Sequence, residues 1–454
     1  MLLAALALTS SLMPSGSFQA PLIHASQPPL ASTQEPSLAG QFLPDKLSDK
    51  KTAFPQPFAK GAQKKQFVIR GTKGWGWTPE QYMETIPTLV KGRMNFLMNC
   101  YVSMFTDPEK WINNWWEPIP EAKKRGFERV VRECQKRHIQ FCFAIHPQLG
   151  TKRPFDFNSE KDFADLWQHY SWMQSLGVQW FSVSLDDIAV DRAGINYSGT
   201  NHAKLVNRLF SKLREKDPKA QMVFCPTCYW GDGTAPDHRP YLESLAKELH
   251  PDVYVFWTGD AVYTAKVTRK AAETYKGIVK HRLVLWDNFP VNDRNPALHL
   301  GPVVARDKDL CEVIDGYMSN PMARETTLNT LPLLTCADYA YNPYAYDPAR
   351  SIGQAVLWLG KTAEQRQLLL ELVKLFPGPL VRGMEGSQYN WPLEDLRTMK
   401  SAAEATALLS RVEQALSGLE RLYPDAMLGE KATLRRELDA LKQGVREKFG
   451  VVGG

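Results

Sequence analysis

Three consecutive stretches decide the fold class: QFCFAI at residues 140–145, EKDFADLWQHYSWM at 160–173 and WFSVSL at 180–185. The first and third are short and rich in aromatic and aliphatic residues, which is typical of buried strands. The middle stretch is longer and amphipathic, and it favours a helix. A strand, a helix and a second strand in this order form a βαβ unit, in which the two strands run parallel.

The same alternation extends over residues 66–350, where helical patterns such as Pro79–Leu89 and Glu121–Arg137 separate the strands. Its length and rhythm predict a (β/α)8 TIM barrel. A doubly wound open sheet is the alternative, and such sheets often carry a glycine-rich phosphate-binding loop after a strand. Gly71–Gly76 lacks the spacing of such a loop, and no other predicted strand is followed by a glycine-rich loop. The expected strands are Phe67–Arg70, Asn95–Tyr101, Gln140–Ile145, Trp180–Leu185, Met222–Cys225, Val253–Trp257, Leu283–Trp286 and Gly316–Ser319.

The regions on either side of the predicted barrel differ from it in composition. Residues 1–20 start with the apolar run MLLAALALTSSLM, which predicts a signal peptide and an exported, periplasmic or extracellular protein. No Lys or Arg precedes this run, so an apolar N-terminus of a cytoplasmic protein is the alternative. Residues 21–65 are rich in Pro, Ser, Gln and Lys and predict a flexible linker, whereas 351–454 carry only helical patterns and predict a helical domain.

The composition excludes several functional classes. The chain has 55 Lys and Arg against 49 Asp and Glu without a long block of one sign, so we expect no nucleic-acid partner. Beyond the N-terminus no apolar run approaches the roughly 20 residues of a membrane span, so no integral membrane segment is expected in the mature chain. The seven scattered Cys and the nine His predict neither a disulfide framework nor a metal site.

Polar residues that directly follow the predicted strands are the first candidates for chemistry, because barrel enzymes place their sites there. The pair Asp186-Asp187 follows the apolar run at 180–185. Adjacent carboxylates disfavour each other's ionisation, so one of them tends to keep a proton near neutral pH. Consecutive strand residues point to opposite faces, so the two can share a pocket only if the strand ends or bulges at this point.

An adjacent pair is poorly placed to flank a glycosidic bond as nucleophile and acid. It suits substrate-assisted hydrolysis better, in which the 2-acetamido oxygen of the sugar attacks the anomeric carbon. One carboxylate then holds the acetamido nitrogen, and the other protonates the leaving oxygen. The 13 Trp also fit a carbohydrate site, because indole rings stack on sugar faces.

At these residues the chain resembles glycoside hydrolase family 84, the β-N-acetylglucosaminidases. The resemblance covers the whole predicted barrel, and the Asp pair together with Trp286–Asp293 is its most specific part. It is carried by GTKG at 71–74, LDDI at 185–188, CPTCY at 225–229, FWTG at 256–259, WDNFPVND at 286–293, LGP at 300–302, NP at 320–321, ADY at 337–339 and NP at 342–343.

The resemblance implies a retaining, metal-free mechanism without a cofactor, through an oxazoline intermediate, on a glycan or glycoconjugate with terminal β-linked N-acetylglucosamine. By similarity, Asp186 would orient the acetamido group and Asp187 would act as general acid and then base. Tyr229 would hydrogen-bond the acetamido oxygen. The other implied substrate-binding residues are Gly71 through a nearby carbonyl, Thr258 as a pocket-lining position, Trp286 and Asn288 as the wall, and Asp293 and Asn320 on the sugar hydroxyls.

The chain departs from the family after the second predicted strand, where the family carries a sugar-binding lysine. The matching stretch at 99–104 reads NCYVSM and has none. Lys73, at the end of the neighbouring strand, is the candidate replacement. Because of this departure, two alternatives stay open: an N-acetylhexosaminidase with a shifted sugar preference, and a sugar-binding barrel without turnover.

Overall fold

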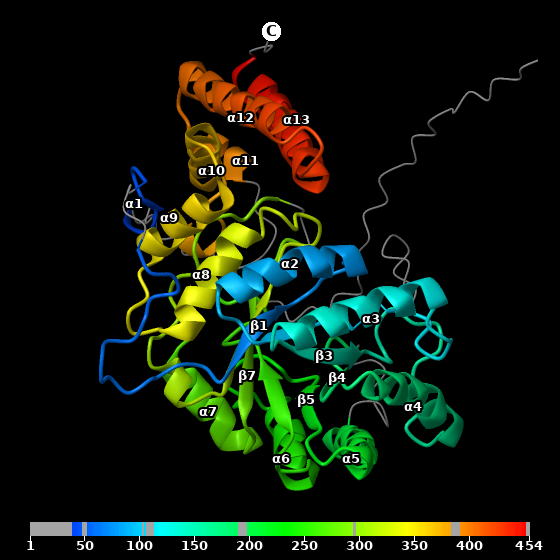
Figure 1. The fold of residues 1–454 in the computed structure, drawn as a ribbon. Helices are drawn as coiled ribbons and strands as arrows, with labels where there is room; N and C mark the ends of the chain where they lie inside the picture. Colours follow the sequence, from blue (N-terminus) through cyan, green and yellow to red (C-terminus); the bar gives the residue numbers. More distant parts are fainter. Residues whose placement is uncertain are drawn as a thin grey trace, which may run out of the picture.

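The structure is a computed structural model that describes residues 39–47, 52–101, 104–105, 113–188, 198–293, 297–382 and 391–450. Eight parallel strands close into a barrel in chain order, which confirms the predicted (β/α)8 fold (Figure 1). The strands are β1 (Ile69–Lys73), β2 (Phe96–Met98), β3 (Gln140–Ile145), β4 (Trp180–Ser184), β5 (Gln221–Cys225), β6 (Tyr254–Trp257), β7 (Leu283–Pro290) and β8 (Gly316–Asn320).

Helices follow the strands and surround the barrel. They are α2 (Pro79–Lys91), α3 (Glu121–Lys136), α4 (Glu160–Ser175), α5 (Gly199–Lys216), α6 (Arg239–Glu248), α7 (Arg269–Val279) and α8 (Thr330–Tyr341), with a short 3-10 helix, η3 (Leu310–Glu312), before β8.

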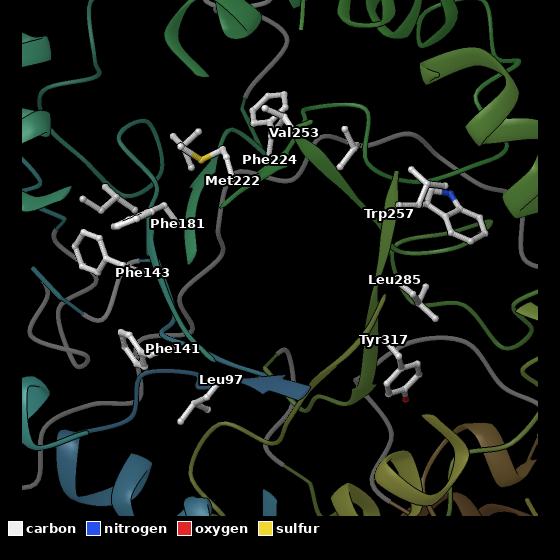
Figure 2. Close-up of a cluster of buried hydrophobic side chains, with 14 of the residues drawn as sticks. Leu97, Phe141, Phe143, Phe181, Met222, Phe224, Val253, Trp257, Leu285 and Tyr317 are labelled. Atoms are coloured by element: carbon white, nitrogen blue, oxygen red, sulfur yellow. The ribbon is translucent and has the colours of Figure 1, made fainter. Parts of the chain in front are cut away.

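Side chains alternate in direction along each strand and form two apolar layers, one outside and one inside the barrel. Leu97, Phe143 and Phe181 belong to the core between strands and helices, and Figure 2 shows them pointing outward from the ring of strands. Their neighbours along the strands, such as Met98 and Ala144, belong to the cluster that fills the barrel interior. Strand residues are therefore buried on both sides, which is why the sequence shows continuous apolar runs.

Three strands differ from the predicted limits by more than one residue. β2 ends at Met98 instead of Tyr101, because the Asn99 side chain bonds both the N–H and the carbonyl of Ala144 in place of a strand ladder. β1 starts at Ile69, two residues later than predicted, and continues through Lys73. Residues 71–73 pair with β2, and residues 69–72 pair with β8. β7 runs on to Pro290, where its register with β8 shifts.

Part of the segment at 21–65, which the sequence predicts to be a linker, contacts the folded region. The short helix α1 (Ala39–Phe42) lies near α9 (Pro348–Leu359), and the Gln56 backbone N–H donates to the Asp338 side chain. These contacts bind the segment to the outside of the barrel. Residues 1–38 lie outside the described residues, so the signal peptide and export remain predictions.

The C-terminal region is helical, as predicted. It consists of α9 (Pro348–Leu359), α10 (Ala363–Leu375), the 3-10 helix η4 (Leu380–Arg382), α11 (Trp391–Thr398), α12 (Ala402–Leu422) and α13 (Leu428–Phe449). Thr362 and Gln365 form the expected capping box before α10. No helix in the described ranges combines the length and the apolar character that crossing a bilayer requires.

These helices share an apolar core with the barrel loops, and α13 also makes polar contacts with them. Glu437 accepts a hydrogen bond from the Leu298 backbone N–H at 2.9 Å. Glu430 accepts from the N–H groups of Thr327 and Leu328 at 2.9 and 3.0 Å. Helix α13 therefore anchors the segments that follow β7 and β8.

Candidate active site

A cavity opens at the carboxyl ends of the strands, where a TIM barrel places its site. The cavity brings together every predicted site residue except Gly71. Its walls are formed by Lys73, Trp75, Tyr101, Asp186, Asp187, Cys225, Tyr229, Thr258, Val262, Tyr263, Trp286, Asn288, Asp293 and Asn320.

The Asp pair meets the geometric condition that the sequence imposed. Strand β4 ends at Ser184, before the pair, and Asp187 has a left-handed backbone with φ of 53°. This conformation is uncommon for a residue other than glycine, although Asp tolerates it better than most. It ends the strand alternation, so both carboxylates line one cavity.

Asp186 is the buried member of the pair, with 5% of its surface exposed. The Tyr101 hydroxyl donates to its Oδ2 at 3.2 Å, while its buried Oδ1 has no hydrogen-bond partner among the described residues. Burial raises the pKa of Asp186, and the Lys73 ammonium and several hydrogen bonds, including that from Tyr101, oppose this rise. These groups favour the ionised form of Asp186.

Asp187 is the exposed member, which solvent reaches in the cavity. Its Oδ1 accepts a hydrogen bond from the Tyr229 hydroxyl at 2.9 Å. Protein surrounds the carboxyl closely enough that burial raises the pKa of Asp187, and the charge of Asp186 raises it further. The bond from Tyr229 opposes the rise but does not cancel it. Burial raises the pKa of both carboxyls to about 6, and in Asp187 the charge of Asp186 adds to the rise.

His146, which directly follows β3, fixes the backbone of the pair. Its Nδ1 accepts from the N–H groups of Gln148 and Leu149 at 3.2 and 3.0 Å, so Nε2 carries the ring hydrogen. Nε2 lies 2.7 Å from the Asp186 carbonyl oxygen and donates to it. Burial lowers the pKa of His146 to about 4, so the ring stays neutral and adds no charge.

Two neighbouring strands supply the wall beside Asp187. Tyr229 follows β5, and its carbonyl accepts from the Thr258 N–H at 2.9 Å. The Thr258 hydroxyl donates to the Ala261 carbonyl at 3.0 Å. Thr258 thus holds the turn after β6 as well as lining the cavity.

The wall formed by β7 and β8 presents amide and carboxylate groups. Asn320 Nδ2 donates to Asn288 Oδ1 at 2.7 Å, and Asn288 Nδ2 donates to the Val262 carbonyl at 2.6 Å. This leaves Asn320 Oδ1 buried without a partner among the described residues. Asp293 accepts from the Tyr263 hydroxyl at 2.9 Å. Both are suited to hydroxyl groups of a ligand.

A buried ion pair behind β7 supports this wall. Asp287 points away from the cavity, between the inward-facing Trp286 and Asn288, and pairs with Arg306 at 2.7 Å. The Tyr317 hydroxyl donates to the same carboxylate at 2.8 Å. The pair fixes the strand segment from which the sugar-facing side chains project.

The binding role that the resemblance implies for a carbonyl near Gly71 stays a prediction. Gly71 lies within β1 and is not among the residues that line the cavity. A Cβ at this position would lie 2.0 Å from the Phe96 carbonyl oxygen, so glycine allows β2 to approach. Lys73, two residues later on the same strand, lines the cavity instead.

The sequence reading missed Tyr101 and His146. His146 directly follows the predicted strand Gln140–Ile145, so the rule that selected the Asp pair would have found it. Tyr101 was placed at the end of the predicted strand Asn95–Tyr101, so this rule could not select it. Within the described part of the chain, no group of three or more His, Cys, Asp and Glu is placed to hold a metal ion.

Comparisons with known proteins match the barrel region of the chain. The β-N-acetylglucosaminidase family profile matches residues 68–374. Protein O-GlcNAcase of Mus musculus is 26% identical over 262 residues, which are 56% of this chain and 27% of the mouse protein. Protein O-GlcNAcase of Rattus norvegicus is 27% identical over the same length, with the same shares. The chain thus spans about a quarter of the length of these curated relatives.

Solved structures share the fold. CpGH84B has a TM-score of 0.63 and 22% identity, with 84% of this chain and 67% of that one covered. A mutant of the O-GlcNAc hydrolase of Thermobaculum terrenum has a TM-score of 0.64 and 21% identity, with shares of 84% and 83%. Because the family profile matches well over half of the sequence, including the complete barrel, this chain belongs to the β-N-acetylglucosaminidase family of glycoside hydrolases.

Proposed function

We propose that this chain hydrolyses terminal β-linked N-acetylglucosamine and that the substrate's own acetamido oxygen is the nucleophile. One observation carries the proposal: two adjacent carboxylates line the same cavity with different surroundings. Asp186 is buried beside Lys73 and Tyr101, which favour its charge, whereas Asp187 is exposed to the cavity, and the pKa of each carboxyl is raised to about 6. The relatives named O-GlcNAcase support the same sugar.

Asp186 is suited to hold the acetamido group. Its Oδ1 lacks a partner among the described residues and can accept the acetamido N–H. An ionised carboxylate at this point stabilises the positive charge that develops on the amide as its oxygen attacks the anomeric carbon. Tyr101 and His146 restrict the side chain and the backbone of Asp186, so little reorganisation is needed.

Asp187 is suited to move the proton. In the first step the acetamido oxygen forms a bond to the anomeric carbon while the glycosidic bond breaks, and Asp187 donates its proton to the departing oxygen. The products are the departing alcohol and a bicyclic oxazoline that keeps the amide proton, an oxazolinium ion whose N–H stays hydrogen-bonded to the Asp186 carboxylate. In the second step Asp187, now a carboxylate, removes a proton from water as the water opens the oxazoline. Two inversions give net retention at the anomeric carbon.

The remaining polar wall is suited to the hydroxyl edge of the sugar. Asp293 and Asn320 offer acceptor oxygens from β7 and β8, and Trp286 offers an apolar ring face. A terminal sugar can place its hydroxyls against this wall with its anomeric carbon near the Asp pair.

The first test is an assay of the purified protein on nitrophenyl glycosides. We expect turnover of the β-N-acetylglucosaminide, negligible turnover of the plain β-glucoside, and strong inhibition by a thiazoline that mimics the oxazoline. The rate should be the same after dialysis against a chelator.

The same assay separates the two alternatives. Faster turnover of the β-N-acetylgalactosaminide would indicate a hexosaminidase with a shifted preference. Thiazoline binding without turnover of either sugar would indicate a non-catalytic barrel. Efficient hydrolysis of the β-glucoside would refute substrate assistance as the only route.

A further inference from the structure

Lys73 presents a buried ammonium group at the active-site cavity. It is the last residue of β1, lines the cavity and is only 2% exposed. Its Nζ lies 4.7 Å from the ring centroid of Trp286, 5.1 Å from that of Tyr101 and 5.4 Å from that of Trp75. Because all three rings line the cavity, the charged end of Lys73 faces the space that a ligand occupies.

The protein satisfies this ammonium poorly. Among the described residues its hydrogen-bond partner is the Cys100 Sγ at 3.9 Å, a weak acceptor. Its charge also acts on the nearby Asp186 carboxylate, but the two groups form no ion pair. Aromatic faces attract a cation. They do not offer its three N–H donors the directed lone pairs that an oxygen acceptor would offer. Buried charges are normally paired or hydrogen-bonded, so an oxygen acceptor for Lys73 is missing among the described residues.

We propose that Lys73 is a substrate-binding residue that donates a hydrogen bond to a hydroxyl of the terminal sugar. This inference rests on the proposed function, since it assumes a sugar in the cavity. A neutral hydroxyl fits better than an anionic substituent, because Asp186, Asp187 and Asp293 line the same cavity and repel negative charge. The ring faces around Lys73 favour the C–H surface of a sugar.

The order of the strands indicates which hydroxyl Lys73 reaches. β1 pairs with β8, which carries Asn320, on one side and with β2 on the other. Tyr101 follows β2 and contacts Asp186, which we assign to the acetamido group on carbon 2. Lys73 thus stands between the acetamido end and the wall formed by Asn320. The hydroxyl on carbon 3, next to the acetamido-bearing carbon, is the one in this position.

The test measures binding as well as turnover in Lys73→Met and Lys73→Arg variants. We expect Lys73→Met to bind the thiazoline about 10–100-fold more weakly than wild type by calorimetry, as for loss of a hydrogen bond to a charged group. Lys73→Arg keeps the charge and is expected to recover part of the loss. The exposed Lys60 gives a matched control, because Lys60→Met makes the same chemical change outside the cavity.

Monodeoxy aryl substrates identify the bond. The loss in kcat/KM caused by Lys73→Met should vanish on the 3-deoxy sugar and persist on the 4-deoxy and 6-deoxy sugars. Equal thiazoline binding by wild type and both variants, or an equal loss on all three deoxy sugars, would overturn the proposal. These outcomes differ from failure of the proposed function, in which the wild-type protein itself neither binds the thiazoline nor hydrolyses the glycoside.

Discussion

Asp187→Asn is expected to lower kcat/KM for an alkyl β-N-acetylglucosaminide by about 10²–10⁴-fold, which is the usual contribution of a general acid. An alkoxide is a poor leaving group and needs the proton that Asn cannot supply. A dinitrophenolate leaves without protonation, so the loss on that substrate should be about tenfold or less. Steady-state kinetics on the two substrates measure the difference.

The exposed Asp425 gives a matched control, because Asp425→Asn removes a carboxylate outside the cavity. It should leave kcat/KM on both substrates unchanged. An equal loss on both substrates in Asp187→Asn would contradict its role as the acid. If neither substrate were affected, the LDDI stretch at 185–188 would have only a structural role.

Asp186→Asn is expected to lower kcat/KM by about 10²–10³-fold on both substrates, the cost of losing one preorganised electrostatic contact in the transition state. The neutral amide no longer stabilises the charge that develops on the acetamido group, and this loss is independent of what departs. The same two-substrate measurement applies. A large loss confined to the alkyl glycoside would reverse the roles of Asp186 and Asp187.

The barrel could be predicted from the sequence because each strand is buried on both sides. Runs such as 140–145 are apolar throughout, and parallel strands joined by helices leave few alternatives. The predicted positions of the strand ends were less accurate, because polar side-chain contacts determine where a strand ends. Asn99 replaces a strand ladder after β2, and the Asp287–Arg306 pair supports the longer β7. Neither contact has a signal in local periodicity.

The candidate site was predicted in part. The predicted residues that line the cavity follow apolar runs or belong to a specific motif; they include the Asp pair, Tyr229, Trp286, Asn288 and Asp293. The left-handed conformation of Asp187 is a property of the folded chain, although the sequence showed that some interruption was needed. The contact of Tyr101 with Asp186 depends on barrel closure, which brings the ends of β2 and β4 to one cavity.

The central claim is that the acetamido oxygen of the substrate is the nucleophile, and fluorination of the acetamido group tests it most directly. Each fluorine withdraws electrons and makes the carbonyl oxygen a weaker nucleophile, while the leaving group stays the same. We predict that kcat/KM for aryl glycosides falls steadily from the acetamido through the mono-, di- and trifluoroacetamido sugars. A rate that stays constant across this series would contradict the account, because the nucleophile would then belong to the protein or to water.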